Sequence, residues 1–297
     1  PCPGMPLEFA RYYNSLITNA GTLGQGWSHS YAWSLTIDEQ SVRATTAGGR
    51  QYWFDGTTGT TFSAPFENNW RLAFTNNIYQ VTLPGGVSYR FGTNGTLERI
   101  QDVWSNALFL AYTNTGSAEQ LISVSSTNGI ALSFTYTNER LSRIDTPSSN
   151  LWIEYQYDAY GKLTSSVRTA GAEISRTLYL YGANSLITQR VNAAGTCFAH
   201  SYSTNDNKAI GLKVDGTYYE HSVEYPSADT STVTYARGAQ NQVLTYAIDT
   251  NILRILSIAG PGSQMQDFSH DLSGNVTNYT VLDTNTGSHL TLVSDYD

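Results

Sequence analysis

The segment LWIEYQYDAYGKL, residues 151–163, contains the unit from which most of the chain is built. Residues 151–157 are rich in aromatic and β-branched side chains, which is typical of a β-strand. The next four residues, Asp-Ala-Tyr-Gly at 158–161, are typical of a tight turn, because glycine adopts a positive φ at little steric cost and aspartate hydrogen-bonds nearby backbone amides. An apolar residue, Leu163, follows the turn. The segment therefore predicts a β-hairpin.

The aromatic residue before this turn recurs along the chain at intervals of 21 to 26 residues. The ten positions, called stations below, are Phe91, Tyr112, Tyr136, Tyr157, Tyr181, Tyr202, Tyr225, Tyr246, His270 and Tyr296. Two strands of about 6–8 residues and two connections of about 2–5 residues fill such an interval. The spacing predicts an all-β array of antiparallel hairpins, with the repeated rings stacked between neighbouring units. No helix is expected.

Glycine follows the station by four residues in several units. These turn glycines are Gly95, Gly116, Gly161 and Gly274. Two other units have Arg140 and Ser185 at this place. Because neither residue adopts a positive φ as easily as glycine, we expect a different turn type in both.

Length, composition and charge exclude several classes of protein. The chain has 297 residues, of which 13% are charged and 40% hydrophobic, with 24 acidic and 16 basic side chains and a net charge of −8. The repeat favours one continuous body over separate domains. Without a Lys/Arg cluster, neither a nucleic acid nor an anionic membrane is expected as a partner. No apolar stretch approaches the roughly 18–20 residues of a membrane span. The low Lys content, with abundant Thr, Asn and Tyr, is typical of a secreted or surface-exposed bacterial protein.

The two cysteines, Cys2 and Cys197, leave two interpretations open. They are either free, or they form a disulfide that ties the N-terminal segment to the array or to an adjacent copy in an oxidising compartment. No Cys/His cluster has zinc-like spacing, so no metal or cofactor is expected. The last residues, 294–297, resemble the opening of another unit, and we expect the array to be cut mid-repeat. Either more chain follows, or a neighbouring subunit completes the edge.

The candidates for catalysis are weak. His29 lies between two serines, but adjacent side chains on a strand point to opposite faces, and no acid partner is identifiable. Most aspartates lie at or near turns, where they cap backbone amides, and a glycosidase would need two carboxylates in one cleft. Trp53, Trp70 and Trp104 are either sugar-stacking residues or packed core and seam residues. We therefore predict no catalytic, cofactor-binding or metal-binding residue.

A specific resemblance is carried by residues 4–35, GMPLEFARYYNSLITNAGTLGQGWSHSYAWSL. The motif residues are Arg11, Tyr12, Asn14, Gly24, Gly26 and Trp27. This segment resembles the one that precedes the repeats in Rhs/YD-repeat proteins, which include bacterial Rhs toxins, Tc-toxin cocoons and animal teneurins, and the units YDAYGKL and HDLSGNV are similar to the repeat of that family. The resemblance implies a sheet of hairpins that curls into a hollow shell, a β-shell or β-solenoid, often around a toxic domain. The chain departs from the toxins, because it has no Asp-Pro dipeptide for self-cleavage and no effector domain after the repeats.

These observations predict a leader and capping β region over residues 1–85 and a repeat array over 86–297. We expect a non-enzymatic extracellular structural protein, either the wall of a toxin-enclosing cocoon or a subunit of a filament or surface layer that self-associates through sheet edges. The alternative is an adhesin or carbohydrate-binding module that binds glycans. An enzyme ranks third.

Overall fold

The computed structural model describes residues 4–56, 62–64, 69–114, 119–215, 220–237, 240–249, 254–260, 264–270 and 276–293. These ranges contain 28 β-strands and no helix, so the prediction of an all-β chain is confirmed. None of the described segments forms an apolar helix of membrane-spanning length. The 21 strands β8–β28 form one sheet in which strands adjacent in the chain are adjacent in the sheet, and every described pairing between them is antiparallel. This is the predicted array of hairpins.

The chain divides into two compact units. Unit 1 comprises Pro1–Pro65 and Trp70–Leu180, and unit 2 comprises Phe66–Asn69 and Tyr181–Asp297. The division lies within the array predicted over 86–297, whereas β8 and β9, which fall in the predicted leader region, already belong to the large sheet.

Unit 1 begins with seven short strands before the large sheet. They are β1 (Arg11–Tyr13), β2 (Ala20–Gly21), β3 (Gly24–Gln25), β4 (Trp27–His29), β5 (Ser34–Ile37), β6 (Ser41–Thr45) and β7 (Gln51–Asp55). β1 pairs with β4, β2 pairs with β3, and β5, β6 and β7 form a three-stranded sheet, all antiparallel. We call residues 4–35 the leader segment and residues 20–25, which contain β2 and β3, the leader hairpin.

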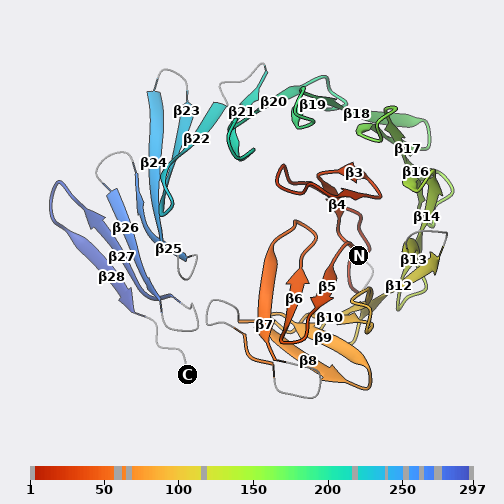
Figure 1. The fold of residues 1–297 in the computed structure, drawn as a ribbon. Helices are drawn as coiled ribbons and strands as arrows, with labels where there is room; N and C mark the ends of the chain where they lie inside the picture. The colour runs from red at the N-terminus through yellow and green to blue at the C-terminus, as the bar shows by residue number, and fades with distance from the viewer. Residues whose placement is uncertain are drawn as a thin grey trace. The chain divides into compact units, whose positions relative to one another are not determined.

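The large sheet of unit 1 runs from β8 to β18. Its strands are β8 (Arg71–Thr75), β9 (Ile78–Thr82), β10 (Ser88–Phe91), β11 (Leu97–Gln101), β12 (Ala107–Asn114), β13 (Glu119–Ser126), β14 (Ala131–Thr137), β15 (Arg140–Asp145), β16 (Leu151–Tyr157), β17 (Leu163–Ala170) and β18 (Glu173–Tyr181). In register, one face of this sheet is apolar, and its members include Leu72, Val81, Ile100, Leu108, Val124, Leu132, Phe134, Ile144 and Tyr155, all buried. Within unit 1, Figure 1 shows the sheet curving around the leader strands, which lie on its concave side. The leader segment therefore helps to bury this face.

Unit 2 continues the same pattern with fewer buried side chains. Its strands are β19 (Ile187–Val191), β20 (Cys197–Tyr202), β21 (Ala209–Val214), β22 (Glu220–Ser227), β23 (Thr230–Arg237), β24 (Gln240–Asp249), β25 (Arg254–Ala259), β26 (Gln264–His270), β27 (Val276–Asp283) and β28 (His289–Val293). Among its described residues, the buried apolar side chains are Leu186, Ile187 and Val214. Leu290 and Leu292, on β28, are exposed.

The stations share one place in the hairpin. Phe91, Tyr112, Tyr136, Tyr157, Tyr202 and His270 each stand just after a register shift, opposite Leu97, Leu121, Leu141, Leu163, Ala209 and Val276, respectively. A β-bulge of this kind bends the strand and increases its twist. Tyr225 lies within a register shift between β22 and β23, and Tyr181 is the last residue of β18. Tyr246 differs in position, because the register shift of its strand comes after Ala247. Tyr296 lies outside the described residues.

The turns explain the sequence differences between units. Gly95 and Gly161 have φ of +81° and +76°. Each lies in a short loop in which the backbone N–H of the first residue donates to the carbonyl of the residue four positions later. Ser185 has φ of +66° in a loop with the same hydrogen bonds, so the expectation of a different turn there is wrong. A non-glycine residue holds the left-handed conformation at this site, at some cost in strain. Gly116 and Gly274 lie outside the described residues.

The prediction of a different turn holds in the unit of Tyr136. Asn138 and Glu139 both have positive φ, of +49° and +64°, between Thr137 and Arg140. Two consecutive left-handed residues form a type I′ turn, whose twist matches that of the flanking strands.

Candidate functional site

The leader segment meets the sheet of unit 1 first through Phe9. Its ring centre lies 5.6 Å from that of Phe134 on β14 and 6.5 Å from that of Tyr155 on β16. The ring of His29 on β4 stacks on the other side, at 5.1 Å. Each aromatic pair adds about 0.5–1.5 kcal/mol beyond the burial of its area, so Phe9 joins two hairpins to the leader segment.

His29 has the contacts of a packing residue. Its Nδ1 accepts the backbone N–H of Tyr31 at 3.3 Å, and its ring is buried against Phe9. Burial lowers the pKa of His29 to about 4, because the imidazolium would lose its hydration. The side chain is therefore neutral near pH 7.

Arg11 and Trp27 attach the leader segment to two further strands. The guanidinium carbon of Arg11 lies 5.1 Å from the ring centre of Tyr155 and 5.8 Å from that of Tyr179. Trp27, which is buried, meets Tyr179 edge to face at 4.9 Å. Burial raises the pKa of Tyr155 to about 12, and the nearby Arg11 opposes part of that rise. Among the described residues, Arg11 forms no ion pair with a carboxylate, and these cation–π contacts hold it in the interface.

The leader hairpin docks between two turns of the sheet through its backbone. The N–H of Leu141 donates to the carbonyl of Thr22 at 2.9 Å, and Arg140 Nη1 donates to the carbonyl of Gly21 at 2.6 Å. Gly24 has φ of +97°, and a Cβ at this residue would lie 2.7 Å from the carbonyl oxygen of Gly161. Only glycine allows this approach of two backbones.

A second backbone contact lies further along the leader segment. The N–H of Leu35 donates to the carbonyl of Gly95 at 2.9 Å, and Ser34 forms an isolated bridge with Thr96. A Cβ on Gly95 would lie 2.1 Å from the carbonyl oxygen of Leu35. Gly95 therefore allows both the positive φ of the turn and the close contact with the leader segment.

The remaining motif residues shape the leader segment itself. Asn14 donates from Nδ2 to the carbonyl of Gly48 at 3.2 Å, and its backbone N–H donates to the carbonyl of Gly26 at 2.9 Å. Gly26 has φ of +77°. Tyr12 is exposed, and neither it nor the other motif residues form a cluster with catalytic geometry.

The station tyrosines connect successive hairpins by their hydroxyls. Tyr136 OH donates to the carbonyl of Leu121 at 2.9 Å, and Tyr157 OH donates to that of Leu141 at 2.6 Å. Each acceptor lies opposite the preceding station, so one tyrosine links two units. Burial raises the pKa of Tyr136 to about 12 and also raises that of Tyr157.

Four rings form a column in unit 1 that sequence reasoning missed. Tyr52 stacks on Trp70 with ring centres 3.7 Å apart, Trp70 on Trp33 at 5.5 Å, and Trp33 on Tyr89 at 4.1 Å. Trp70 is therefore a packed residue, which is one of the two roles that the sequence left open for it. The four rings come from separate segments of the chain, so no spacing in the sequence reveals their contact.

One pocket of about 290 Å³ lies between the leader segment and the sheet of unit 1. Its lining includes His29, Tyr31, Trp33, Tyr112, Glu119 and Tyr136. Glu119 accepts hydrogen bonds from Thr96 Oγ1 at 2.6 Å and from Asn94 Nδ2 at 3.1 Å. Its carboxylate is thus bound by neighbouring side chains. Burial is the main cause of the raised pKa of Tyr112, and the negative charge of Glu119 is the second cause.

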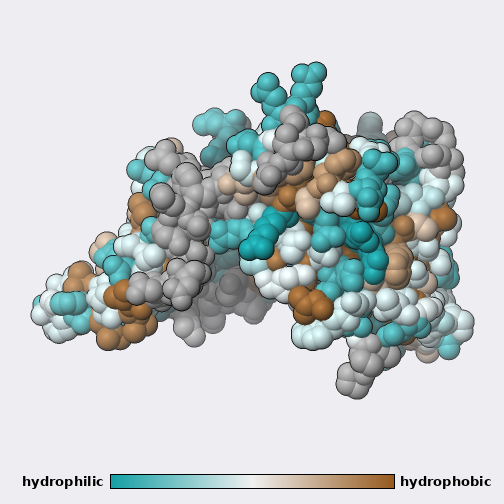
Figure 2. Space-filling view, turned by 90° about the horizontal axis from the view of Figure 1, so that it is seen from below, coloured by the Kyte–Doolittle hydropathy of each residue, from teal (hydrophilic) through white to brown (hydrophobic). Residues whose placement is uncertain are grey.

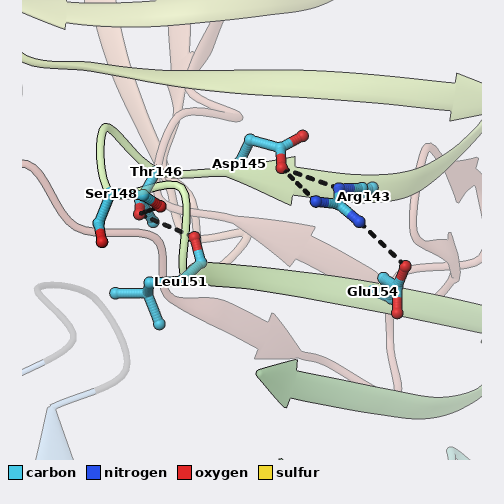
Figure 3. Close-up of polar contacts among 6 residues, drawn as sticks. All are labelled: Arg143, Asp145, Thr146, Ser148, Leu151 and Glu154. Atoms are coloured by element: carbon cyan, nitrogen blue, oxygen red, sulfur yellow. Dashed lines mark hydrogen bonds and ion pairs between the residues drawn. The ribbon is translucent and has the colours of Figure 1, made fainter. Parts of the chain in front are cut away.

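The opposite face of β15 and β16 carries charged side chains. Figure 3 shows Arg143 between two carboxylates, with Asp145 at 2.6 Å and Glu154 at 3.2 Å, and its guanidinium carbon lies 4.7 Å from the ring centre of Trp152. Half-exposed ion pairs of this kind contribute at most about 1 kcal/mol. On the face seen in Figure 2, hydrophobic residues form small patches among hydrophilic ones.

The other predicted positions lie apart from one another. Cys197 is half-buried on β20, where burial and the nearby Asp215 raise the pKa of its thiol. Cys2 lies outside the described residues, so the disulfide stays a prediction. Trp53 lies beneath Arg43, at 5.0 Å, and Trp104 is 80% exposed at a hairpin tip. Within the described ranges, no three His, Cys, Asp or Glu side chains are grouped as metal ligands would be.

Comparison with known proteins gives a partial family match and distant structural similarity. Residues 1–54 match a protein-family model described as a domain of unknown function, DUF6531. None of the curated proteins compared with the chain matches it. The structure is similar to a TcdB2-TccC3-Cdc42 crystal structure, with 14% identity and a TM-score of 0.45 over 86% of this chain and 15% of that chain.

Two further solved structures are similar at lower scores. A Tc holotoxin pore from Photorhabdus luminescens has 12% identity and a TM-score of 0.37 over 86% of this chain and 19% of that chain. A porin-like protein from Bacteroides uniformis has 10% identity and a TM-score of 0.29 over 75% of this chain and 91% of that chain. The chain therefore spans less than a fifth of the length of the two toxin chains.

Proposed function

We propose that this chain is a non-enzymatic structural protein of the Rhs/YD-repeat type, which builds a β-sheet wall in an extracellular setting. The observation that carries the proposal is the docking of the leader segment in unit 1. Its side chains and backbone contact the sheet from the turn at Gly95 to Tyr179 on β18. Arg11, Gly24 and Trp27 of the motif contact the sheet, whereas Asn14 and Gly26 shape the leader segment.

Two uses of such a wall are proposed, in line with the sequence. One is a subunit of an extracellular filament or surface layer, and the other is part of a shell that encloses a toxic polypeptide. Electron microscopy and analytical ultracentrifugation of the purified protein test the proposal. Fibres or sheets support the first use, and closed particles support the second. A compact monomer that hydrolyses a polysaccharide or peptide would overturn the structural role.

A carbohydrate-binding module is the second candidate. The observation in its favour is Trp104, which is 80% exposed at the tip between β11 and β12. Exposed aromatic rings stack on the apolar faces of sugars. Binding on a glycan array that is lost in Trp104→Ala, with an unchanged melting temperature, would favour this candidate. Binding that is insensitive to this substitution would count against it.

A further inference from the structure

Unit 2 repeats, at another pair of stations, the hydrogen bond by which a station tyrosine links two hairpins in unit 1. In unit 1, Tyr157 OH donates to the carbonyl of Leu141, the residue opposite the preceding station. In unit 2, Tyr225 OH donates to the carbonyl of Ala209 at 3.4 Å, and Ala209 lies opposite the preceding station, Tyr202, across the same kind of bulge. The residues Leu141 and Ala209 are therefore equivalent in the repeat.

A cation precedes the carbonyl residue in both places. Arg140, before Leu141, donates to the backbone carbonyl of Gly21 in the leader hairpin. Lys208, before Ala209, has its ammonium 5.1 Å from the ring centre of Tyr225 and 2.9 Å from Asp206. A lysine carries three donors, so contact with one carboxylate leaves it able to donate to a further carbonyl.

In unit 2, a pocket lies beside Lys208 and Tyr225, the residues equivalent to Arg140 and Tyr157. The pocket has a volume of about 600 Å³ and is lined by Ser203, Asn205, Asp206, Lys208, Glu224 and Tyr225, among others. A volume of roughly 300–1,000 Å³ is usual for binding sites. Tyr225 is 47% exposed, more than any other described station. Its ring therefore forms an accessible wall.

We propose that this Lys208–Tyr225 pocket binds a short, glycine-containing β-hairpin of another polypeptide, as the Arg140–Tyr157 site binds the leader hairpin. The cation donates to a backbone carbonyl of the hairpin, and the tyrosine ring packs against its backbone. The two carboxylates in the lining, Asp206 and Glu224, favour a hairpin that is neutral or basic. The leader hairpin itself, Ala-Gly-Thr-Leu-Gly-Gln at 20–25, carries no charge. The inference stands apart from the proposed function, because either use of the wall is compatible with it.

The test uses the full chain and a cyclic peptide that contains residues 18–26, TNAGTLGQG. Cyclisation holds the hairpin and reduces the entropy lost on binding. We expect saturable binding by isothermal titration calorimetry. The Lys208→Ala variant should weaken it by about tenfold or more, which corresponds to about 1.4 kcal/mol. Tyr225→Phe, which retains the ring, should retain most of the binding, and Tyr225→Ala should lose it.

A matched variant separates this pocket from other sites. Lys213→Ala removes a lysine whose side chain is 60% exposed and which pairs with Glu220, so it should leave binding unchanged. Equal affinity of the wild type and Lys208→Ala, or no binding at all, would overturn the proposal. Binding of a neutral oligosaccharide that depends on Lys208 and Tyr225, without binding of the peptide, would assign the pocket to sugars instead.

Discussion

At the scale of single residues, the leucines that lie opposite the stations are buried. Leu97, Leu141 and Leu163, opposite Phe91, Tyr136 and Tyr157, have no exposed surface. These leucines follow the turns in the sequence, and the structure shows that they are among the most buried residues of the core. The bulge that places them there has no signature in the sequence, because it depends on how two strands pair.

Removal of one such leucine should be costly. Leu141→Ala leaves a cavity beside Tyr136 and is expected to lower the free energy of unfolding by about 2–5 kcal/mol. Ile122→Ala, at a half-exposed position on β13, is the matched control and should cost much less. Chemical denaturation followed by tryptophan fluorescence measures both. Equal losses in the two variants would contradict the central place of Leu141.

His29 makes the stability of unit 1 sensitive to acid. Its pKa is lowered to about 4 in the folded chain, so the unfolded chain, with an ordinary pKa near 6.5, takes up a proton first as the pH falls. His29 leaves the free energy of unfolding unchanged above about pH 6.5 and lowers it as the pH falls further, by about 3 kcal/mol at pH 4. We expect His29→Gln to have a flatter profile of melting temperature between pH 7 and pH 4. Parallel profiles for wild type and variant would show that another group controls the acid response.

Ser185 carries backbone strain that its neighbouring turn avoids. Ser185 has φ of +66°, whereas Gly195 has φ of +81° in a loop with the same hydrogen bonds. Ser185→Gly should therefore stabilise unit 2 by about 0.5–1 kcal/mol, after the larger entropy of glycine in the unfolded chain is subtracted. The reciprocal change, Gly195→Ser, should destabilise it. Differential scanning calorimetry compares the two, and shifts of the same sign would refute the strain.

At the scale of elements, the docking of the leader hairpin depends on glycine at one position. Gly24→Ala would place a Cβ 2.7 Å from a backbone oxygen of Gly161 and strain a φ of +97°. We expect the free energy of unfolding to fall by about 2–4 kcal/mol, of which backbone strain contributes about 1–2 kcal/mol and the steric clash a similar amount. Limited proteolysis should then cleave the leader segment faster than in the wild type.

Two other glycines separate the causes of that loss. Gly171 has φ of +61° but no atom near its absent Cβ, so Gly171→Ala reports strain alone. Gly48 has open space and an ordinary φ, so Gly48→Ala should be nearly neutral. If Gly24→Ala and Gly171→Ala cost the same and leave proteolysis of the leader segment unchanged, close backbone contact does not hold the hairpin.

The elements were largely predictable from sequence, and their contacts were not. The periodic aromatics and turn glycines predict hairpins in chain order, because pairing between neighbours is local. The docking of Phe9 and Trp27 against strands more than 100 residues away depends on the curvature of the sheet. The stack of Trp33 on Tyr89 and the pocket beside Lys208 likewise arise only after folding. The sequence contained one usable signal for that pocket, which is a cation directly before the residue opposite a station.

At the scale of the whole molecule, stability should be uneven along the chain. Nearly all buried apolar side chains among the described residues lie before Tyr181. Burial of apolar area is the main favourable term in folding, so unit 2 should open before unit 1. Hydrogen exchange of the full chain should show slower exchange in β9 to β17 than in β22 to β28. The reverse order, or one uniform rate, would contradict this expectation.

The neighbour-by-neighbour pairing of the strands has a consequence for how such a protein changes in evolution. Each hairpin in the interior of the large sheet lies between the strand before it and the strand after it. An in-frame duplication of one interval, 21 to 26 residues, would insert two antiparallel strands and leave the direction and partner type of all the others intact. Gene duplication can therefore lengthen this sheet without the formation of a new core.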